Sequence, residues 1–117
     1  DLTVTEVKIK DYDAVAFIGG PGMGKIIGDD TLQLLAKRFY EARKLTTAIC
    51  IAPSVLAEAG ILENKKATVF PDGKEALITG GAQYTGDDIT VDGLIITANG
   101  PRAATNFAKK IIEKLAQ

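Results

Sequence analysis

The sequence contains no histidine and no tryptophan, and it has one cysteine and one methionine among 117 residues. The missing histidine excludes, within this chain, a Ser–His–Asp triad, a Cys–His dyad and any metal site that uses histidine. A single cysteine, Cys50, cannot form an internal disulfide, which is typical of a reducing compartment, so we expect a cytoplasmic location. No apolar run approaches the length needed to cross a bilayer, and we expect no membrane partner.

Charge and size are also unremarkable for a globular protein. The chain has 14 basic and 15 acidic residues, a formal net charge of −1 and 46% hydrophobic residues. Because no basic stretch is present, we expect no nucleic-acid partner. The length fits one domain, residues 1–117, with a single core.

Short apolar runs alternate with helical patterns along the chain. Buried strands are predicted at residues 14–18, 47–49, 67–70 and 94–98, and helices begin at a capping Asp30, at Pro53 and after Asn99-Gly100-Pro101. This alternation predicts an α/β fold with a mostly parallel sheet covered on both sides, and a ligand site at the carboxyl ends of the strands. Smaller expectations are an edge strand at 4–9, a short strand or helical turn at 76–79, and a hairpin arm at 82–85. The last helix should bury one apolar face, formed by Ala104, Phe107, Ala108, Ile111, Ile112 and Leu115.

The only cysteine stands between a predicted strand and a predicted helix. Ala48 and Ala52 lie two positions either side of Cys50, which is the small-x-nucleophile-x-small pattern of a nucleophile elbow. Pro53 suits the first turn of the following helix, whose N-terminus would favour a thiolate. We therefore predict Cys50 as a catalytic residue. The alternative is that Cys50 is a small buried hydrophobic residue.

A glycine-rich loop follows the strand at 14–18. We expect the N–H groups of Gly20 and Ile51 to converge on one oxygen as an oxyanion hole. Gly19 and Tyr84 are predicted at the rim of the same pocket. An alternative for the loop is a Walker A motif, since residues 19–25 match G-x-x-x-x-G-K, but Ile26 replaces the hydroxyl residue that binds magnesium.

Acidic residues gather at Asp87, Asp88 and Asp92. Their spacing fits no EF-hand loop, and acids in a glycine-rich turn are usually solvated. We therefore expect no metal site and no cofactor.

Several segments together resemble the DJ-1/PfpI family, which belongs to the class I glutamine-amidotransferase-like α/β fold. The resemblance implies a flavodoxin-like three-layer sandwich, usually dimeric, with Cys50 as the reactive centre and Gly20 and Ile51 as oxyanion-hole donors. Members have been described as peptidases or amidases, glyoxalase- or deglycase-type enzymes, chaperones and oxidative-stress proteins. The segments are residues 14–20 (AVAFIGG), 48–53 (AICIAP), 59–62, 66–69 and 92–101 (DGLIITANGP).

The chain departs from the family pattern at the residues that carry acid–base chemistry. Peptidase-like members have histidine directly after the cysteine, where this chain has Ile51. Other members supply a histidine before a proline, where this chain has Phe70 at the pocket rim. The acidic residue that peptidase-like members take from a partner subunit corresponds to Gly24. The family also begins with a strand–helix–strand unit that contributes a glutamate to the sulfur, so we expect the natural protein to be longer.

Three functions remain as hypotheses. The first is a reactive-cysteine protein of oxidative stress or of protein and metabolite repair, with glyoxalase- or deglycase-like chemistry on a small carbonyl compound. The second is a cysteine peptidase or amidase acting on a peptide, which ranks lower because it needs a general base. The third is a non-enzymatic binding module with an inert Cys50. In each case the expected protein partner is a second copy of the chain.

Overall fold

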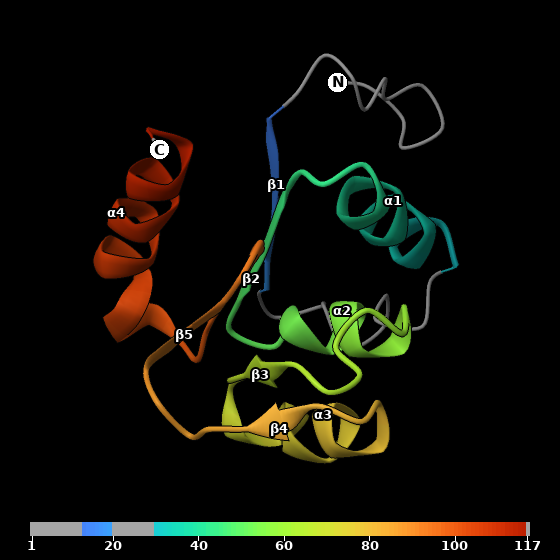
Figure 1. The fold of residues 1–117 in the computed structure, drawn as a ribbon. Helices are drawn as coiled ribbons and strands as arrows, with labels where there is room; N and C mark the ends of the chain where they lie inside the picture. The colour runs from blue at the N-terminus through green and yellow to red at the C-terminus, as the bar shows by residue number, and fades with distance from the viewer. Residues whose placement is uncertain (1–12, 20–29, 117) are drawn as a thin grey trace.

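The computed structural model describes residues 13–19 and 30–116, and Figure 1 shows their arrangement. The elements follow in the order β1 (Ala14–Ile18), α1 (Asp30–Glu41), β2 (Leu45–Ile49), α2 (Pro53–Glu58), β3 (Lys66–Ala67), η4 (Pro71–Gly73), α3 (Lys74–Thr79), β4 (Gln83–Tyr84), β5 (Ile89–Asp92), β6 (Ile95–Ala98), η5 (Pro101–Ala103) and α4 (Ala104–Leu115).

The main sheet has four strands in the order β1-β2-β6-β5. Strands β1, β2 and β6 run parallel, with Ala16 opposite Thr47 and Ala48 opposite Thr97, whereas β5 pairs antiparallel with β6. All five residues of β2 are buried, as expected of a central strand covered on both faces. Strand β2 therefore fixes the place of the residue that follows it, Cys50.

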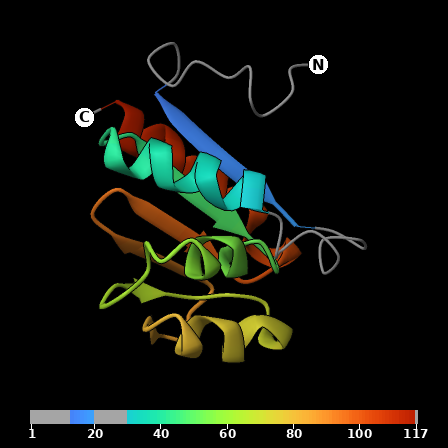
Figure 2. The same cartoon turned by 90° about the vertical axis from the view of Figure 1, so that its right-hand side faces the viewer.

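Helices cover both faces of this sheet (Figures 1 and 2). Helix α4 lies on one side, where Phe107 packs in a cluster with Leu45 and Ile96. Helices α1 and α2 lie on the other side, where Leu56 and Phe17 share a second cluster. The predicted α/β class, with a mostly parallel sheet flanked by helices, is confirmed.

Helix α4 buries less of its apolar face than the sequence pattern predicts. Phe107 is only 5% exposed, but Ile112 is 65% exposed and Leu115 is 48% exposed. The i, i+3, i+4 pattern gives the direction of the face, but the sheet below contacts only part of its width. Within residues 13–19 and 30–116, no helix combines the length and apolar character needed to cross a bilayer.

The middle of the chain differs most from the sequence predictions. The strand expected at 67–70 is reduced to β3, because the Thr68 N–H donates to the Thr97 side-chain hydroxyl at 2.9 Å instead of to the backbone of a neighbouring strand. The segment 76–79 belongs to helix α3, and β4 pairs parallel with β3 instead of forming a hairpin arm. Strand β5 was not predicted, although its buried Thr90 and exposed Val91 do alternate.

Of the remaining predictions, one is corrected, two fall outside the described residues and one is confirmed. Helix α1 begins at Asp30 itself, so Asp30 is its first residue and not the residue before it. The edge strand expected at 4–9 and the glycine loop from Gly20 to Gly24 lie outside the described residues. Helix α2 does begin at Pro53, and Gly60 follows its end with φ of 82°.

Threonine hydroxyls join β6 to the segment that follows β3. Besides the bond to Thr97, Thr68 uses its own hydroxyl to donate to the Asp87 carbonyl at 2.6 Å. The hydroxyls of Thr85 and Thr90 share a further hydrogen bond of 2.6 Å. These bonds anchor residues 68–70 beside the end of β6, close to where β2 ends.

We expect Thr97→Val to destabilise the protein by about 1–3 kcal/mol, because it leaves the Thr68 N–H without its acceptor at a site where Thr97 is fully buried. Urea unfolding followed by circular dichroism measures the loss. Thr105→Val, at an exposed position on α4, is the control and should change stability by less than about 0.5 kcal/mol. Equal losses in the two variants would contradict a specific role for this hydrogen bond.

Candidate functional site

Cys50 occupies a strained turn at the carboxyl end of β2. Its φ is 65°, in the left-handed region, and among the described residues only Arg43 and Asn64 share this property without being glycine. A non-glycine residue in that region costs roughly 1–3 kcal/mol and persists only where the surroundings enforce it. The side chain is partly exposed, while the residues of β2 before it are buried.

Two hydrogen bonds hold the backbone of Cys50 from opposite sides. The Cys50 N–H donates to the carbonyl of Ala98, at the end of β6, at 3.0 Å. The Cys50 carbonyl accepts from the N–H of Phe70, after β3, at 2.8 Å. The turn is also closed internally, because the Ala52 N–H donates to the Ile49 carbonyl at 3.2 Å. Two other parts of the chain, together with a hydrogen bond inside the turn, therefore fix the conformation of this one residue.

Gly19 permits the end of β1 to approach the same turn closely. A Cβ atom at position 19 would lie 3.0 Å from the Ile51 nitrogen and 3.1 Å from the Ala52 nitrogen. Both distances are shorter than most contacts that Cβ atoms make in proteins, so glycine suits this position. The Gly19 N–H itself donates to the Ile49 carbonyl at 3.2 Å. Gly19 thus lies beside the Cys50 turn, next to its backbone amides.

Of the two predicted oxyanion-hole donors, Ile51 belongs to the described residues and Gly20 does not. Within the part of the chain that the structure describes, the Ile51 N–H has no hydrogen-bond acceptor. Ile51 follows Cys50 directly, so its N–H is a candidate donor to an oxygen bound to the Cys50 sulfur. Gly20 lies outside the described residues, so the convergence of its N–H with that of Ile51 stays a prediction.

The other two predicted rim residues, Phe70 and Tyr84, lie in different parts of the structure. Phe70 is 41% exposed, and its Cδ1 atom lies 3.8 Å from the position that a Cβ would take on Gly100, just after β6. Tyr84 lies in β4, where the Lys74 ammonium stands 5.2 Å from the centre of its ring. The place of Tyr84 at the rim of the Cys50 site stays a prediction.

A close contact that the sequence did not predict joins η4 to the start of α2. A Cβ on Gly73 would lie 2.7 Å from the Ser54 Oγ and 2.9 Å from the Ile51 Cδ1, so only glycine fits. Ser54 is 1% exposed, and its hydroxyl has no hydrogen-bond partner among the described residues. Asp72-Gly73 has the sequence of an ordinary turn, and nothing in it signals this contact.

The acidic residues of the β4–β6 region serve as local hydrogen-bond acceptors. Asp88 Oδ1 accepts from the Asn99 side-chain amide at 3.3 Å, and Asp92 Oδ2 accepts from the Lys66 N–H at 2.8 Å. In residues 13–19 and 30–116, no three carboxylate or thiol side chains are grouped as metal ligands. The carboxylates of Asp88 and Asp92 thus make structural hydrogen bonds, and Asp87 makes hydrogen bonds through its backbone.

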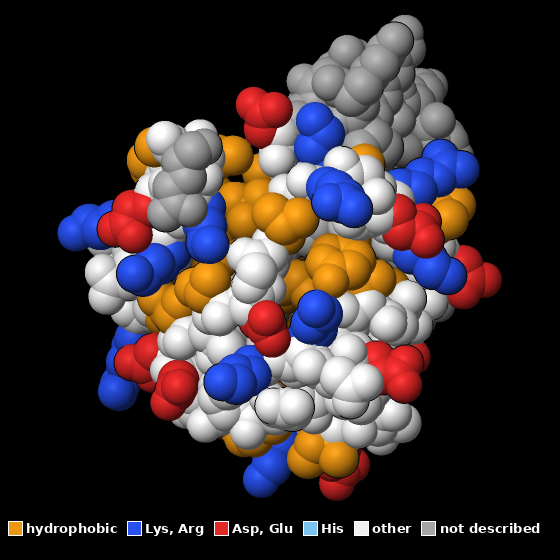
Figure 3. Space-filling view, viewed as in Figure 1, with side chains coloured by type: hydrophobic (Ala, Val, Ile, Leu, Met, Phe, Trp, Pro, Cys, Tyr) orange, Lys and Arg blue, Asp and Glu red, His pale blue; other side chains and the backbone are white. Residues whose placement is uncertain are grey.

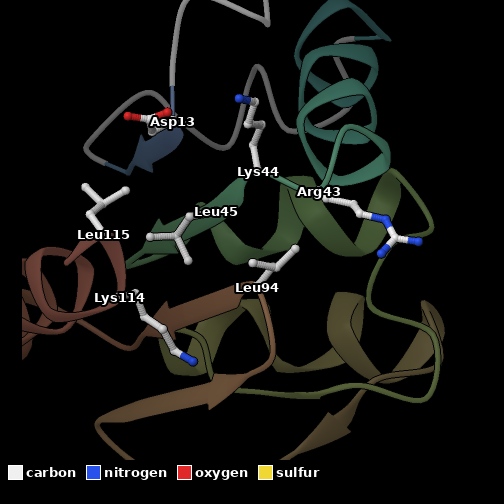
Figure 4. A pocket seen from close by; sticks show the side chains of 7 residues that line it. All are labelled: Asp13, Arg43, Lys44, Leu45, Leu94, Lys114 and Leu115. Atoms are coloured by element: carbon white, nitrogen blue, oxygen red, sulfur yellow. The ribbon is translucent and has the colours of Figure 1, made fainter. Parts of the chain in front are cut away.

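A cavity of about 510 Å³ lies at the opposite end of the sheet from Cys50, near the first residue of β2. Leu45, Leu94 and Leu115 line it, while the charged ends of Arg43 and Lys44 point away from it (Figure 4). Figure 3 shows the same face, with apolar side chains surrounded by basic and acidic ones. The cavity is not lined by a cysteine, and it lies at the end of the sheet opposite to the carboxyl ends of the parallel strands, so we place the candidate chemistry at Cys50.

The fold and the site together define a class: an α/β protein with a mostly parallel sheet and a single cysteine in a strained turn after a central strand. The family model described as the DJ-1/PfpI family matches residues 1–114. The chain belongs to the DJ-1/PfpI family.

Known proteins resemble the chain over nearly its whole length. An uncharacterized protein of Methanocaldococcus jannaschii is 39% identical over 98% of this chain and 58% of its own length. The glutathione-independent glyoxalase DJR-1.2 of Caenorhabditis elegans is 33% identical over 98% of this chain and 61% of its own length. The crystal structure of a ThiJ/PfpI domain protein from Brachyspira murdochii superposes with a TM-score of 0.97 at 33% identity, covering 99% of this chain and 67% of that one. The chain thus spans about three fifths of the length of these two curated relatives.

We expect Cys50→Gly to be more stable than Cys50→Ala by about 1 kcal/mol, because glycine adopts the observed φ of 65° without steric cost. Urea unfolding of both variants measures the difference. The control is Ala104→Gly at the start of α4, where φ is −56° and glycine should instead destabilise by about 0.5–1 kcal/mol. A Cys50→Gly variant less stable than Cys50→Ala would contradict the left-handed turn.

Proposed function

We propose that this protein uses Cys50 as a reactive thiol on a nucleophile elbow, in oxidative-stress defence or in repair of damaged proteins and metabolites. The observation that carries the proposal is the left-handed φ of 65° at a partly exposed cysteine. Such strain concentrates at functional sites, and a cysteine that only filled the core would not require it. On a strand-to-turn-to-helix segment, the strain directs the side chain out of the sheet.

The reaction with peroxide follows from this geometry. The thiolate sulfur attacks one peroxide oxygen and the O–O bond breaks. The sulfur keeps the hydroxyl group as sulfenic acid and is oxidised by two electrons, while the other oxygen leaves as hydroxide, which takes a proton from the solvent to give water. A second equivalent of peroxide gives sulfinic acid. The Ile51 N–H, which lacks an acceptor in the described part of the chain, supports this proposal because it can donate to the oxygen that the sulfur gains.

A second candidate, addition of the thiol to small dicarbonyl compounds, is supported by the relative from C. elegans that is named a glyoxalase. The sulfur would add to the carbonyl carbon, and the carbonyl oxygen would take up a proton. No histidine is present to move that proton, and Phe70 holds the position that carries histidine in other members. We therefore rank this activity second, and peptide hydrolysis below it. A homodimer in the cytoplasm is the setting that we propose for either activity.

Peroxide should oxidise Cys50 selectively. In a Met23→Leu background, which removes the only methionine, we expect intact mass analysis to show two added oxygens at low peroxide excess. Peptide mapping should place both oxygens on Cys50. The Cys50→Ser variant is the control and should gain none. If Cys50 stays reduced while N-acetylcysteine in the same tube is consumed, the proposed function is wrong.

Phe70→His should raise the rate of dicarbonyl consumption by at least about tenfold, because it places a proton-transfer group on the residue whose N–H is bonded to Cys50. Methylglyoxal loss, followed by derivatisation of the remaining aldehyde, measures the rate. Phe70→Leu, which adds no proton-transfer group, is the matched control, and its rate should stay well below that of Phe70→His. Equal rates for the histidine and leucine variants would contradict the view that a missing base limits this reaction.

A further inference from the structure

The segment from Phe70 to Gly73 is fixed against the Cys50 turn at both of its ends. The Phe70 N–H donates to the Cys50 carbonyl at 2.8 Å, and the Gly73 N–H closes the turn by donating to the Phe70 carbonyl at 2.7 Å. At the other end, Gly73 lies against Ser54 and Ile51, where no side chain larger than hydrogen fits. Phe70 therefore cannot move away from the turn without breaking several contacts.

The chain becomes exposed at Phe70, directly after two buried residues. Thr68 and Val69 are fully buried, whereas Phe70 is 41% exposed. The ring reaches toward Gly100, which follows the strand whose Ala98 carbonyl holds the Cys50 N–H. The ring thus extends from one of the two segments bonded to Cys50 toward the other. An aromatic ring that is both exposed and held in place is suited to bind an apolar group.

Apolar side chains border the turn on this side. Ile51 is partly exposed and its Cδ1 faces Gly73, while Pro71 is exposed next to Phe70. The charged residues of the adjoining turns, Asp72 and Arg102, are exposed. Beside Phe70, the described side of the turn therefore offers the apolar side chains of Ile51 and Pro71 as further contacts for an apolar group.

We propose that Phe70 determines the specificity of the Cys50 site, and that the site takes electrophiles with an aromatic or bulky apolar group, in particular organic hydroperoxides. This inference rests on the proposed function. The Cys50 sulfur attacks the terminal oxygen of R–O–OH and the O–O bond breaks. The sulfur keeps the hydroxyl group as sulfenic acid and is oxidised by two electrons, while the alkoxide takes a proton from water and leaves as the alcohol. The R group packs on the Phe70 ring.

Two tertiary hydroperoxides that differ by one phenyl group test the proposal. Oxidation rates of Cys50 are measured with cumene hydroperoxide and tert-butyl hydroperoxide, and their ratio is divided by the same ratio for N-acetylcysteine. We expect a preference of about three- to tenfold for the cumyl compound in the wild-type protein. Phe70→Ala should abolish it and Phe70→Tyr should retain it. Ile112→Ala, which truncates an exposed side chain on α4, is the matched control and should also retain it.

A wild-type ratio near one, or a preference that survives in Phe70→Ala, would overturn the proposal. Gly73→Ala provides an independent variant, because its new Cβ would meet the Ser54 Oγ at 2.7 Å and displace η4 while Phe70 remains. We expect it to lower the preference as well. Circular dichroism confirms that each variant folds, and Phe70→Leu replaces Phe70→Ala if the latter does not.

Alkylation separates this inference from the proposed function. Rates with N-phenyliodoacetamide and iodoacetamide, again divided by the ratio for N-acetylcysteine, report the phenyl preference without any peroxide chemistry. A Cys50 that resists peroxides but shows a Phe70-dependent phenyl preference keeps the specificity role and rejects the proposed function. A Cys50 that is oxidised without any phenyl preference keeps the proposed function and rejects the role of Phe70.

Discussion

The left-handed conformation of Cys50 is the constraint on which the site depends. It is enforced by the hydrogen bond to Ala98 on one side and by the hydrogen bond from Phe70 on the other. The first partner ends β6, which is parallel to β2, and the second ends a segment anchored to β6 through Thr68 and Thr97. The strain at one residue is therefore offset by burial and hydrogen bonding across the centre of the sheet.

The central strands and the Cys50 turn could be predicted because local sequence determines them. A run of apolar residues such as 14–18 has few alternatives to a buried strand, and Pro53 sets the start of α2 by its missing N–H. The short elements could not be predicted, because side-chain hydrogen bonds from distant residues decide them. Strand β3 ends before Thr68, whose N–H donates to the Thr97 hydroxyl. At the first residue of β3, the Lys66 N–H donates to the Asp92 carboxylate.

In the candidate site, too, local sequence predicts some features and not others. The spacing of small residues around a single cysteine predicts a turn at Cys50, which the φ of 65° confirms, while the roles of Cys50 and Ile51 stay predictions. The contact of Gly73 with Ser54 joins segments that are separated in sequence, and neither residue carries a local signal for it. The exposed part of α4 shows the same limit, since periodicity gives the apolar face but not how much of it the sheet covers.

The lack of histidine changes the kind of catalysis that this site supports. Where a histidine assists a cysteine, the rate depends on the ionisation of both groups. Among the described residues, the groups bonded to the Cys50 turn are backbone amides and carbonyls, which do not transfer protons in the physiological range. Such a site favours reactions in which the leaving group needs little help from an acid, and peroxide reduction meets that condition better than amide hydrolysis does.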